Sequence, residues 1–249
     1  MKLLVSMLLA YILGCVNPAC RLAEIRGFDI RERGTGNPGA TNALMSMGLG
    51  SGILVVLLDM GKAMLSILLA SQLCRKAVWA KIMAGVCCTL GHVFPATMGF
   101  KGGRGTACLA GTILYLTPGL FLPMAAGAFL IGVLFDRASL LPPLVTLVYP
   151  VLYELTVGNV RETLLLCLFI PLIGWTHRKN LSRYREGKEI GVRKFFFGGK
   201  KNKEKDHSET GVVFLMPRIE ARQRSGRRAL WCSPDGSRGW FRFSRWCAW

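Results

Sequence analysis

Long uncharged stretches alternate with short polar or basic segments along the first 190 residues. Residues 3–20, 34–58, 82–100 and 105–135 contain no Asp, Glu, Lys or Arg. A helix needs about 20 mostly apolar residues to cross the hydrocarbon layer, and a lipid-exposed backbone must satisfy its hydrogen bonds internally. The pattern therefore predicts membrane-spanning helices over residues 2–20, 45–73, 77–98, 105–117, 119–135, 140–157 and 161–176.

The number of spans depends on how the longest uncharged run is divided. Residues 105–135 contain Thr117-Pro118-Gly119 near their middle, a turn signal that predicts two short helices. A single long tilted helix is the alternative and gives six spans. Residues 1–20 could also be a signal peptide. Their start contains a single lysine, Lys2, and further spans follow, which favours a first membrane anchor.

The basic residues of the loops indicate an orientation. With seven spans and the N-terminus outside, the loops at 21–44, 99–104 and 136–139 and the segment after 176 face the cytoplasm. Through residue 190 these segments hold twelve Lys or Arg residues, whereas the outside segments hold five. This asymmetry agrees with the positive-inside rule. We therefore predict an all-α, polytopic helical bundle with about seven spans and a cytoplasmic C-terminus.

Composition divides the 249-residue chain into two regions. Hydrophobic residues make up 51% and charged residues only 18%, against about 25% charged in a soluble domain. The net charge of +18 could suggest nucleic acid, but half of the excess lies in the last 59 residues. We expect a transmembrane domain over 1–190, no nucleic-acid partner, and a basic extension over 191–249 that is disordered or an artefact of a gene boundary or frameshift.

Cysteine and histidine do not follow a metal or disulfide pattern. The nine cysteines are odd in number and include no C-x-x-C, and most lie in or beside apolar runs. We interpret them as small buried hydrophobes. The three histidines lie far apart with no ligand spacing. We predict neither a metal site nor a cofactor.

Two glycine-rich segments precede spans. Residues 34–42, GTGNPGATN, combine glycines with amide and hydroxyl side chains, and residues 101–105, KGGRG, place two cations around glycines. Glycine lets backbone N–H groups face a ligand, and a helix N-terminus favours an anion. A flexible turn and a basic membrane anchor are the alternatives, so each segment alone leaves phosphate binding open.

Polar residues at helix spacing make a third group of candidates. His177 and Asn180 are three residues apart and share a helix face, although the basic residues around them could simply anchor lipid headgroups. Asp59 and Lys62, also three apart, lie within a predicted span, where charges are costly and indicate a functional site or a structural bridge. We interpret His92 as a helix-packing histidine.

These segments together resemble a known family. GTGNPGATN at 34–42, Gly91-His92-Val93-Phe94-Pro95 with KGGRG at 101–105, and His177-Arg178-x-Asn180 followed by Arg183, Gly187 and Glu189 are similar, in this order, to the motifs of the bacterial acyl-phosphate:glycerol-3-phosphate acyltransferases. Asp59 with Lys62 resembles that family's D-x-x-K element. The resemblance covers about residues 1–190.

The resemblance implies an enzyme of phospholipid synthesis in the bacterial cytoplasmic membrane, with its active site facing the cytoplasm. It would transfer a fatty acyl group from acyl phosphate to the 1-hydroxyl of sn-glycerol 3-phosphate, among membrane lipids and without a cofactor. The oligomeric state is left open. The implied site residues are His177, Asn180 and Thr35 for catalysis; Gly36, Asn37, Gly39, Asn42, Lys101, Gly102, Gly103 and Arg104 for binding phosphate; and Asp59, Lys62, His92 and Glu189 in support.

Three positions depart from the family pattern. Thr35 stands where the family has Ser, Arg104 where it has Lys, and Met45 where it has Arg. A thioether cannot bind phosphate, and losing a desolvated phosphate-pairing cation costs about 2–5 kcal/mol. A catalytically impaired member of the family is therefore one alternative, and a small-anion transporter with Asp59 and Lys62 in its pathway is another.

Overall fold

The computed structural model describes residues 1–75, 77–136, 141–185, 231–232 and 238–239, with side chains up to residue 178. Its contacts divide the chain into two units, Met1–Gly199 and Lys200–Trp249. In the second unit, Trp231–Cys232 (β1) pairs in antiparallel fashion with Arg238–Gly239 (β2), a pairing that the sequence pattern did not predict. The rest of the predicted extension lies outside the described residues.

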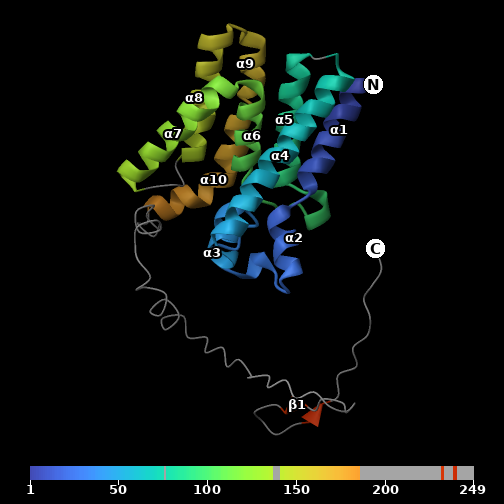
Figure 1. The fold of residues 1–249 in the computed structure, drawn as a ribbon, viewed down its shortest axis with the longest axis vertical. Coiled ribbons are helices and arrows are strands. Elements are labelled where there is room, and N and C mark those ends of the chain that lie inside the picture. Colours follow the sequence, from blue (N-terminus) through green and yellow to red (C-terminus); the bar gives the residue numbers. More distant parts are fainter. Residues whose placement is uncertain (76, 137–140, 186–230, 233–237, 240–249) are drawn as a thin grey trace. The chain divides into compact units, whose positions relative to one another are not determined.

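The first unit is a bundle of helices, as Figure 1 shows. Its α-helices are α1 (Lys2–Cys15), α2 (Pro18–Ile25), α3 (Ala40–Met47), α4 (Leu49–Leu73), α5 (Val78–Val93), α6 (Thr106–Leu116), α7 (Pro118–Phe135), α8 (Leu141–Val157), α9 (Val160–Leu166) and α10 (Phe169–Arg185). Two 3₁₀ turns, η1 (Ile30–Glu32) and η2 (Ala96–Met98), lie in the connections. The predicted all-helical architecture is confirmed.

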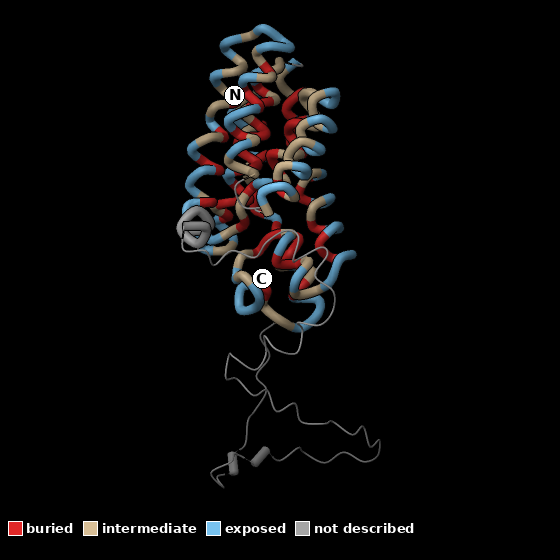
Figure 2. Tube along the Cα trace, turned by 90° about the vertical axis from the view of Figure 1, so that its left-hand side faces the viewer, coloured by how far each residue is buried: buried red, intermediate tan, exposed pale blue. Residues whose placement is uncertain are grey.

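The bundle has the surface of a membrane protein. Five helical stretches in the described chain are long and apolar enough to cross a bilayer: Lys2–Ile25, Leu49–Leu73, Val78–Met98, Pro118–Phe135 and Val160–Arg178. The other two predicted spans correspond to the shorter apolar helices α6 and α8. Figure 2 shows buried positions between the helices and exposed positions on the outside. Large apolar residues such as Leu57, Leu122 and Phe129 are among the exposed ones, which suits contact with lipid.

The division of residues 105–135 into two helices is confirmed. Helix α6 ends at Leu116, Thr117 adopts a non-helical φ of −141°, and Pro118 starts α7. Proline suits the first helical position because its missing N–H has no partner there. The single tilted helix that would give six spans is therefore not formed.

Three other predicted helices differ in detail from the structure, although the first and last of them each fall within one candidate span. The first span breaks at Val16 and Asn17, because Pro18 cannot donate a backbone hydrogen bond and the Asn17 side chain caps α2. Residues 40–47, expected to be mainly loop, form α3, which Gly48 separates from α4 with a φ of +89°. The last span divides into α9 and α10 just before Pro171, and α10 continues to Arg185.

Close helix contacts at glycines hold the bundle together. A Cβ added at Gly14 on α1 would overlap the carbonyl oxygen of Cys88 on α5, and one at Gly91 on α5 would overlap the carbonyl of Tyr11. Small residues of this kind let membrane helices approach closely. The C-terminal end of α5, which carries the predicted site residue His92, is therefore fixed against the end of α1.

Candidate active site

The first glycine-rich segment is organised by a buried asparagine. Asn42, with no exposed surface, donates from Nδ2 to the carbonyls of Ile30 at 2.8 Å and Arg33 at 3.0 Å. Its Oδ1 accepts from the backbone N–H of Thr35 at 2.9 Å and contacts the Ser46 hydroxyl at 3.4 Å. Both sides of the amide are thus used within the protein. In this structure Asn42 shapes the loop that presents Thr35 rather than facing a ligand itself.

The glycine N–H groups of this segment are also engaged. The backbone N–H of Gly36 donates to Arg33, and that of Gly39 donates to Asn37. Gly36 has a φ of +70°, in the left-handed region that favours glycine. We expected these glycines to leave their N–H groups open to phosphate, whereas the structure uses them to close turns. The half-buried side chains of Thr35 and Asn37 and the exposed side chain of Thr41 are polar groups at this surface.

Asn17 connects this segment to the break in the first span. Its Nδ2 donates to the Pro38 carbonyl at 2.9 Å, while its Oδ1 accepts from the Cys20 N–H at 3.0 Å. Asn17 was not among the predicted site residues. The signal was present as Asn-Pro at the end of an apolar run, which combines a helix-capping side chain with a favoured first helical residue.

The second glycine-rich segment folds back onto the end of α5. The backbone N–H of Gly102 donates to the Val93 carbonyl, and that of Gly103 donates to the His92 carbonyl, both at 3.0 Å. A Cβ at Gly103 would overlap Nε2 of His92. These glycines are therefore required for close packing against α5, and their N–H groups are not free for phosphate in this structure. The exposed Lys101 and the half-buried Arg104 flank this packed turn.

Helix α10 approaches the same segment from the other side. The Thr176 hydroxyl lies 3.1 Å from the Arg104 carbonyl, and Ile173 contacts the position that a Gly105 side chain would take. His177, only 4% exposed, follows Thr176 directly. The structure thus brings together KGGRG and His177, which are more than 70 residues apart in sequence.

The contacts of His177 define which ring nitrogen carries the proton. Nδ1 lies 2.9 Å from the carbonyl oxygen of Ile173. Nδ1 also lies 3.0 Å from the Thr176 hydroxyl, which can donate or accept. A carbonyl can only accept a hydrogen bond, so the shorter contact to Ile173 favours Nδ1 as the donor. In the neutral ring Nε2 then carries a lone pair, which is the arrangement that a proton acceptor or a hydrogen-bond acceptor requires.

Asp59, Lys62 and His92 form a buried polar cluster between α4 and α5. Lys62 Nζ lies 2.8 Å from Asp59 Oδ1 and 2.8 Å from His92 Nδ1. It also donates to the carbonyls of Gly14 at 3.1 Å and Val16 at 2.7 Å. The three side chains are each at most 9% exposed. His92 is therefore more than the packing histidine that we expected, because its ring contacts both an ammonium group and the KGGRG segment.

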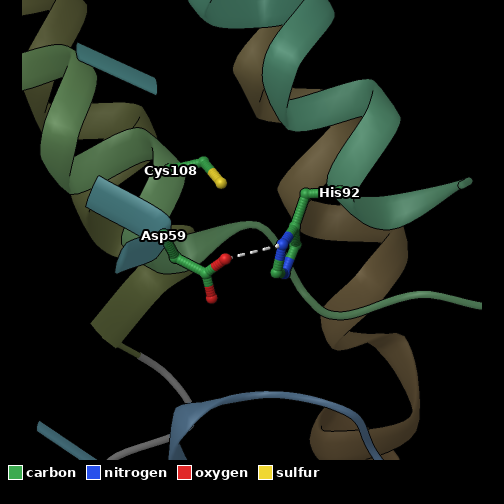
Figure 3. A group of neighbouring side chains, drawn as sticks. All are labelled: Asp59, His92 and Cys108. Atoms are coloured by element: carbon green, nitrogen blue, oxygen red, sulfur yellow. Dashed lines mark ion pairs between the residues drawn. The ribbon is translucent and has the colours of Figure 1, made fainter. Parts of the chain in front are cut away.

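Asp59 and His92 also form a candidate metal-binding group with Cys108, in which the three ligand atoms lie within 4.8 Å of one another. Figure 3 shows these three side chains turned toward one another. Lys62 Nζ, however, already lies within hydrogen-bonding distance of Asp59 and His92. The ammonium group thus supplies the positive charge that a metal ion would bring.

The described residues contain two cavities near these segments. An apolar cavity of about 170 Å³ begins at Thr106, directly after KGGRG, and extends between α6, α7 and α8 past Leu109 and Ile113. A larger groove of about 860 Å³ lies along α1 and α2 and includes Arg31. The Arg31 guanidinium is paired with Asp29 at 2.6 Å and lowers the pKa of that carboxyl. The larger groove also reaches Thr97 and Met98, just before KGGRG. We connect the smaller cavity with an acyl chain, because its lining is apolar and it adjoins KGGRG.

Some predicted site residues are only partly described. The backbone of Asn180 continues α10 three residues after His177, but its side chain lies outside the described residues, as does Glu189. Met45 lies on α3 and is 42% exposed. Figure 1 shows α3, which follows the first glycine-rich segment, at the same end of the bundle as the last turns of α10. This arrangement agrees with the prediction that the loops at 21–44 and 99–104 and the segment after 176 lie on the same side of the membrane.

Comparison with known proteins identifies the family. The family model for glycerol-3-phosphate acyltransferase matches residues 4–187. A glycerol-3-phosphate acyltransferase of Pseudomonas putida is 37% identical over 187 residues, which are 73% of this chain and 95% of that protein. Glycerol-3-phosphate acyltransferase 1 of Deinococcus radiodurans is 33% identical over 189 residues, 75% of this chain and 93% of that protein.

Solved structures agree. The crystal structure of PlsY, an integral membrane glycerol 3-phosphate acyltransferase, in its glycerol 3-phosphate form has a TM-score of 0.72 at 28% identity. It covers 78% of this chain and 98% of the PlsY chain. The lysophosphatidic acid form of PlsY has a TM-score of 0.71. The matched segment contains Thr35, KGGRG and His177, so the chain belongs to the glycerol-3-phosphate acyltransferase family and is an integral membrane acyltransferase.

Proposed function

We propose that the chain transfers a fatty acyl group from acyl phosphate to the 1-hydroxyl of sn-glycerol 3-phosphate. The products are 1-acyl-glycerol 3-phosphate, which is lysophosphatidate, and inorganic phosphate. The observation that carries this proposal is the position of KGGRG between the end of α5 and α10, which brings the backbone of two cationic residues next to the helix that carries the buried His177. Solved relatives in glycerol 3-phosphate and lysophosphatidic acid forms support the same substrate and product.

The charged residues suit two phosphate-bearing substrates. Lys101 is exposed and Arg104 is half-buried at the start of α6. Ammonium and guanidinium groups make strong charge-assisted hydrogen bonds to phosphate. The Thr35 hydroxyl and the Asn37 amide, presented by the loop that Asn42 organises, add neutral donors. We assign phosphate binding to Lys101, Arg104, Thr35 and Asn37, and a shaping role to Gly36, Gly39, Asn42, Gly102 and Gly103.

The proposed reaction is a direct displacement. The glycerol 1-oxygen attacks the acyl carbon, the bond between that carbon and the phosphate oxygen breaks, and the hydroxyl proton leaves with the phosphate. Negative charge develops on the acyl oxygen, so donors placed beside it lower the barrier. We assign His177 and Asn180 to hold and polarise the reacting groups, with Nε2 of His177 as the acceptor that its Nδ1 contact leaves available.

The membrane position follows from the chemistry of the substrates. One substrate is a soluble phosphate and the other carries an acyl chain, so the site must lie at a boundary between water and lipid. The apolar cavity that begins at Thr106 gives the first carbons of the acyl chain a place beside the cations. The excess of Lys and Arg on the loops of this face favours the cytoplasmic side of the bacterial inner membrane.

The test is an acyl-transfer assay on the purified, detergent-solubilised protein with labelled sn-glycerol 3-phosphate. Palmitoyl phosphate, palmitoyl-CoA and palmitoyl acyl-carrier protein are compared as donors. We expect lysophosphatidate from palmitoyl phosphate alone, and a loss of most activity in Lys101→Ala. If product forms from palmitoyl-CoA alone, the acyl donor is acyl-CoA and not acyl phosphate. If the folded protein forms no product from any donor, the chain is an impaired member of the family.

A further inference from the structure

The break in the first span creates a site for an ammonium group. In an unbroken helix the Gly14 carbonyl would accept from residue 18, but Pro18 has no N–H. The Val16 carbonyl would accept from Cys20, whose N–H donates instead to the Asn17 side chain. Lys62, on α4, donates to both carbonyls. The sequence of α1 and α2 thus leaves two acceptors that this lysine satisfies.

The three protons of the ammonium group match three acceptors. Two are the carbonyls, and the third is Nδ1 of His92 at 2.8 Å. Asp59 Oδ1 lies 2.8 Å from Nζ and 3.2 Å from His92 Nδ1, yet among the described residues it has no partner in hydrogen-bond geometry. Asp59 therefore provides the compensating charge, while the hydrogen bonds of Lys62 go to the other three groups.

The shorter of two contacts assigns the tautomer of His92. Its Nδ1 lies 2.8 Å from Lys62 Nζ, which can only donate, and 3.2 Å from Asp59 Oδ1, which can only accept. The shorter contact favours Nδ1 as the acceptor, so the neutral ring is expected to carry its proton on Nε2. Nε2 is the atom that lies against Gly103. His92 and His177 are thus expected to be opposite tautomers, because His177 donates from Nδ1 to the Ile173 carbonyl.

We propose that Lys62 is a positioning residue, which fixes His92 and through it the KGGRG segment relative to the first glycine-rich segment. The connection runs from the Pro38 carbonyl through Asn17 to the neighbouring Val16 carbonyl, then through Lys62 and His92 to Gly103. This inference rests on the proposed function, since the two segments are its phosphate-binding elements. Without Lys62 the connection between the two segments is broken at the Val16 carbonyl and at His92.

The first experiment removes the ammonium group and returns it as a small molecule. Lys62→Ala leaves a space of the size of propylammonium, so we expect kcat/KM for glycerol 3-phosphate to fall at least 30-fold. Propylammonium chloride should then restore at least tenfold, in a saturable manner. Propanol, of similar size but uncharged, should not. Lys81→Ala on α5, outside the cluster, is the matched control and should change kcat/KM less than twofold.

The second experiment reads the tautomer of His92 in the wild-type protein and does not depend on the activity of a variant. Nitrogen NMR of the ¹⁵N-histidine-labelled wild-type protein, with His92 assigned through His92→Gln, should show Nε2 protonated and Nδ1 unprotonated. In Lys62→Met the two tautomers should become mixed. A wild-type protein that is active but carries the proton on Nδ1 of His92 would overturn this inference alone.

Other results of the two experiments test the positioning role of Lys62 and the proposed function separately. A folded Lys62→Ala protein with wild-type kcat/KM, or one that propylammonium does not rescue, would overturn the positioning role. Wild-type protein that is inactive with every acyl donor would overturn the proposed function and the catalytic part of this inference together. The tautomer measurement does not depend on turnover, so the two failures are distinguishable.

Discussion

The hydroxyl of Thr176 lies 3.1 Å from the carbonyl oxygen of Arg104. This contact joins α10 to the KGGRG segment, and it is next to His177 in the chain. The half-buried Thr176 hydroxyl also lies 2.9 Å from the Ile173 carbonyl. One side chain therefore links the imidazole-bearing helix to the backbone of a cation that we assign to phosphate binding.

Thr176→Val keeps the branched shape of the side chain and removes its hydroxyl. Losing one such hydrogen bond costs about 1 kcal/mol, so we expect kcat/KM for glycerol 3-phosphate to fall about fivefold. Thr176→Ser retains the hydroxyl and should stay close to wild type. Steady-state kinetics of wild type, Thr176→Val and Thr176→Ser test this expectation. Equal activity of the two variants would show that the contact between Thr176 and Arg104 does not contribute to activity.

Gly103→Ala should disrupt the turn that packs on His92. The added Cβ would overlap Nε2 of the ring, and overpacking of this kind costs about 1–3 kcal/mol. We expect a lower thermal unfolding temperature in detergent and a loss of most activity. Gly61→Ala is the control, since a Cβ there meets nothing within 4 Å. An unaffected Gly103→Ala would contradict the close approach.

Asn42→Asp should destabilise the first glycine-rich segment although the side chain keeps its shape. A carboxylate cannot donate to the Ile30 and Arg33 carbonyls, and each buried group left without its partner costs about 1–3 kcal/mol. We expect faster tryptic cleavage at Arg31 and Arg33 and a raised KM for glycerol 3-phosphate. Thr41→Ala, at the exposed neighbouring position, should change neither measurement. Unchanged cleavage in Asn42→Asp would show that the amide does not hold this segment.

The helices could be predicted from the sequence because each depends on its own residues. Uncharged runs of sufficient length and the Thr117-Pro118 signal gave the positions of α6 and α7 to within two residues. The three motifs could also be identified, since their glycines and cations are close together in sequence. Their meeting at one end of the bundle follows from the number of helices between them.

The hydrogen-bond partners of the backbone N–H and carbonyl groups could not be predicted from the sequence. Gly102 and Gly103 looked available for phosphate, but their N–H groups donate to Val93 and His92. Whether an N–H is free depends on which carbonyl the fold brings near it. The acceptors of Lys62 were hidden for the same reason, because Gly14 lies 48 residues away in sequence and loses its helical donor only through Pro18.

His177 should be required for turnover more than for stability. His177→Asn keeps a donor near the position of Nδ1, which contacts the Ile173 carbonyl, but it removes the acceptor Nε2. We expect a thermal unfolding temperature near wild type and a fall in kcat of about 10²-fold, because the acceptor that holds the reacting groups in position is lost. His177→Gln, which lacks the Nδ1-like donor, should be less stable. A fully active Asn variant would exclude Nε2 from the reaction.

Met45→Arg tests whether this chain works below the capacity of its family. Met45 lies on α3, one turn after Asn42, and its side chain is 42% exposed. A guanidinium can therefore be accommodated there without a buried-charge cost. If it pairs with a phosphate at this exposed position, a gain of up to about 1 kcal/mol is expected, which corresponds to a KM for glycerol 3-phosphate lower by up to about fivefold. Met45→Gln, of similar length but uncharged, separates charge from shape and should leave KM unchanged. Equal KM values for wild type and Met45→Arg would mean that Lys101 and Arg104 already supply the required charge, and that the thioether is tolerated in a fully competent enzyme.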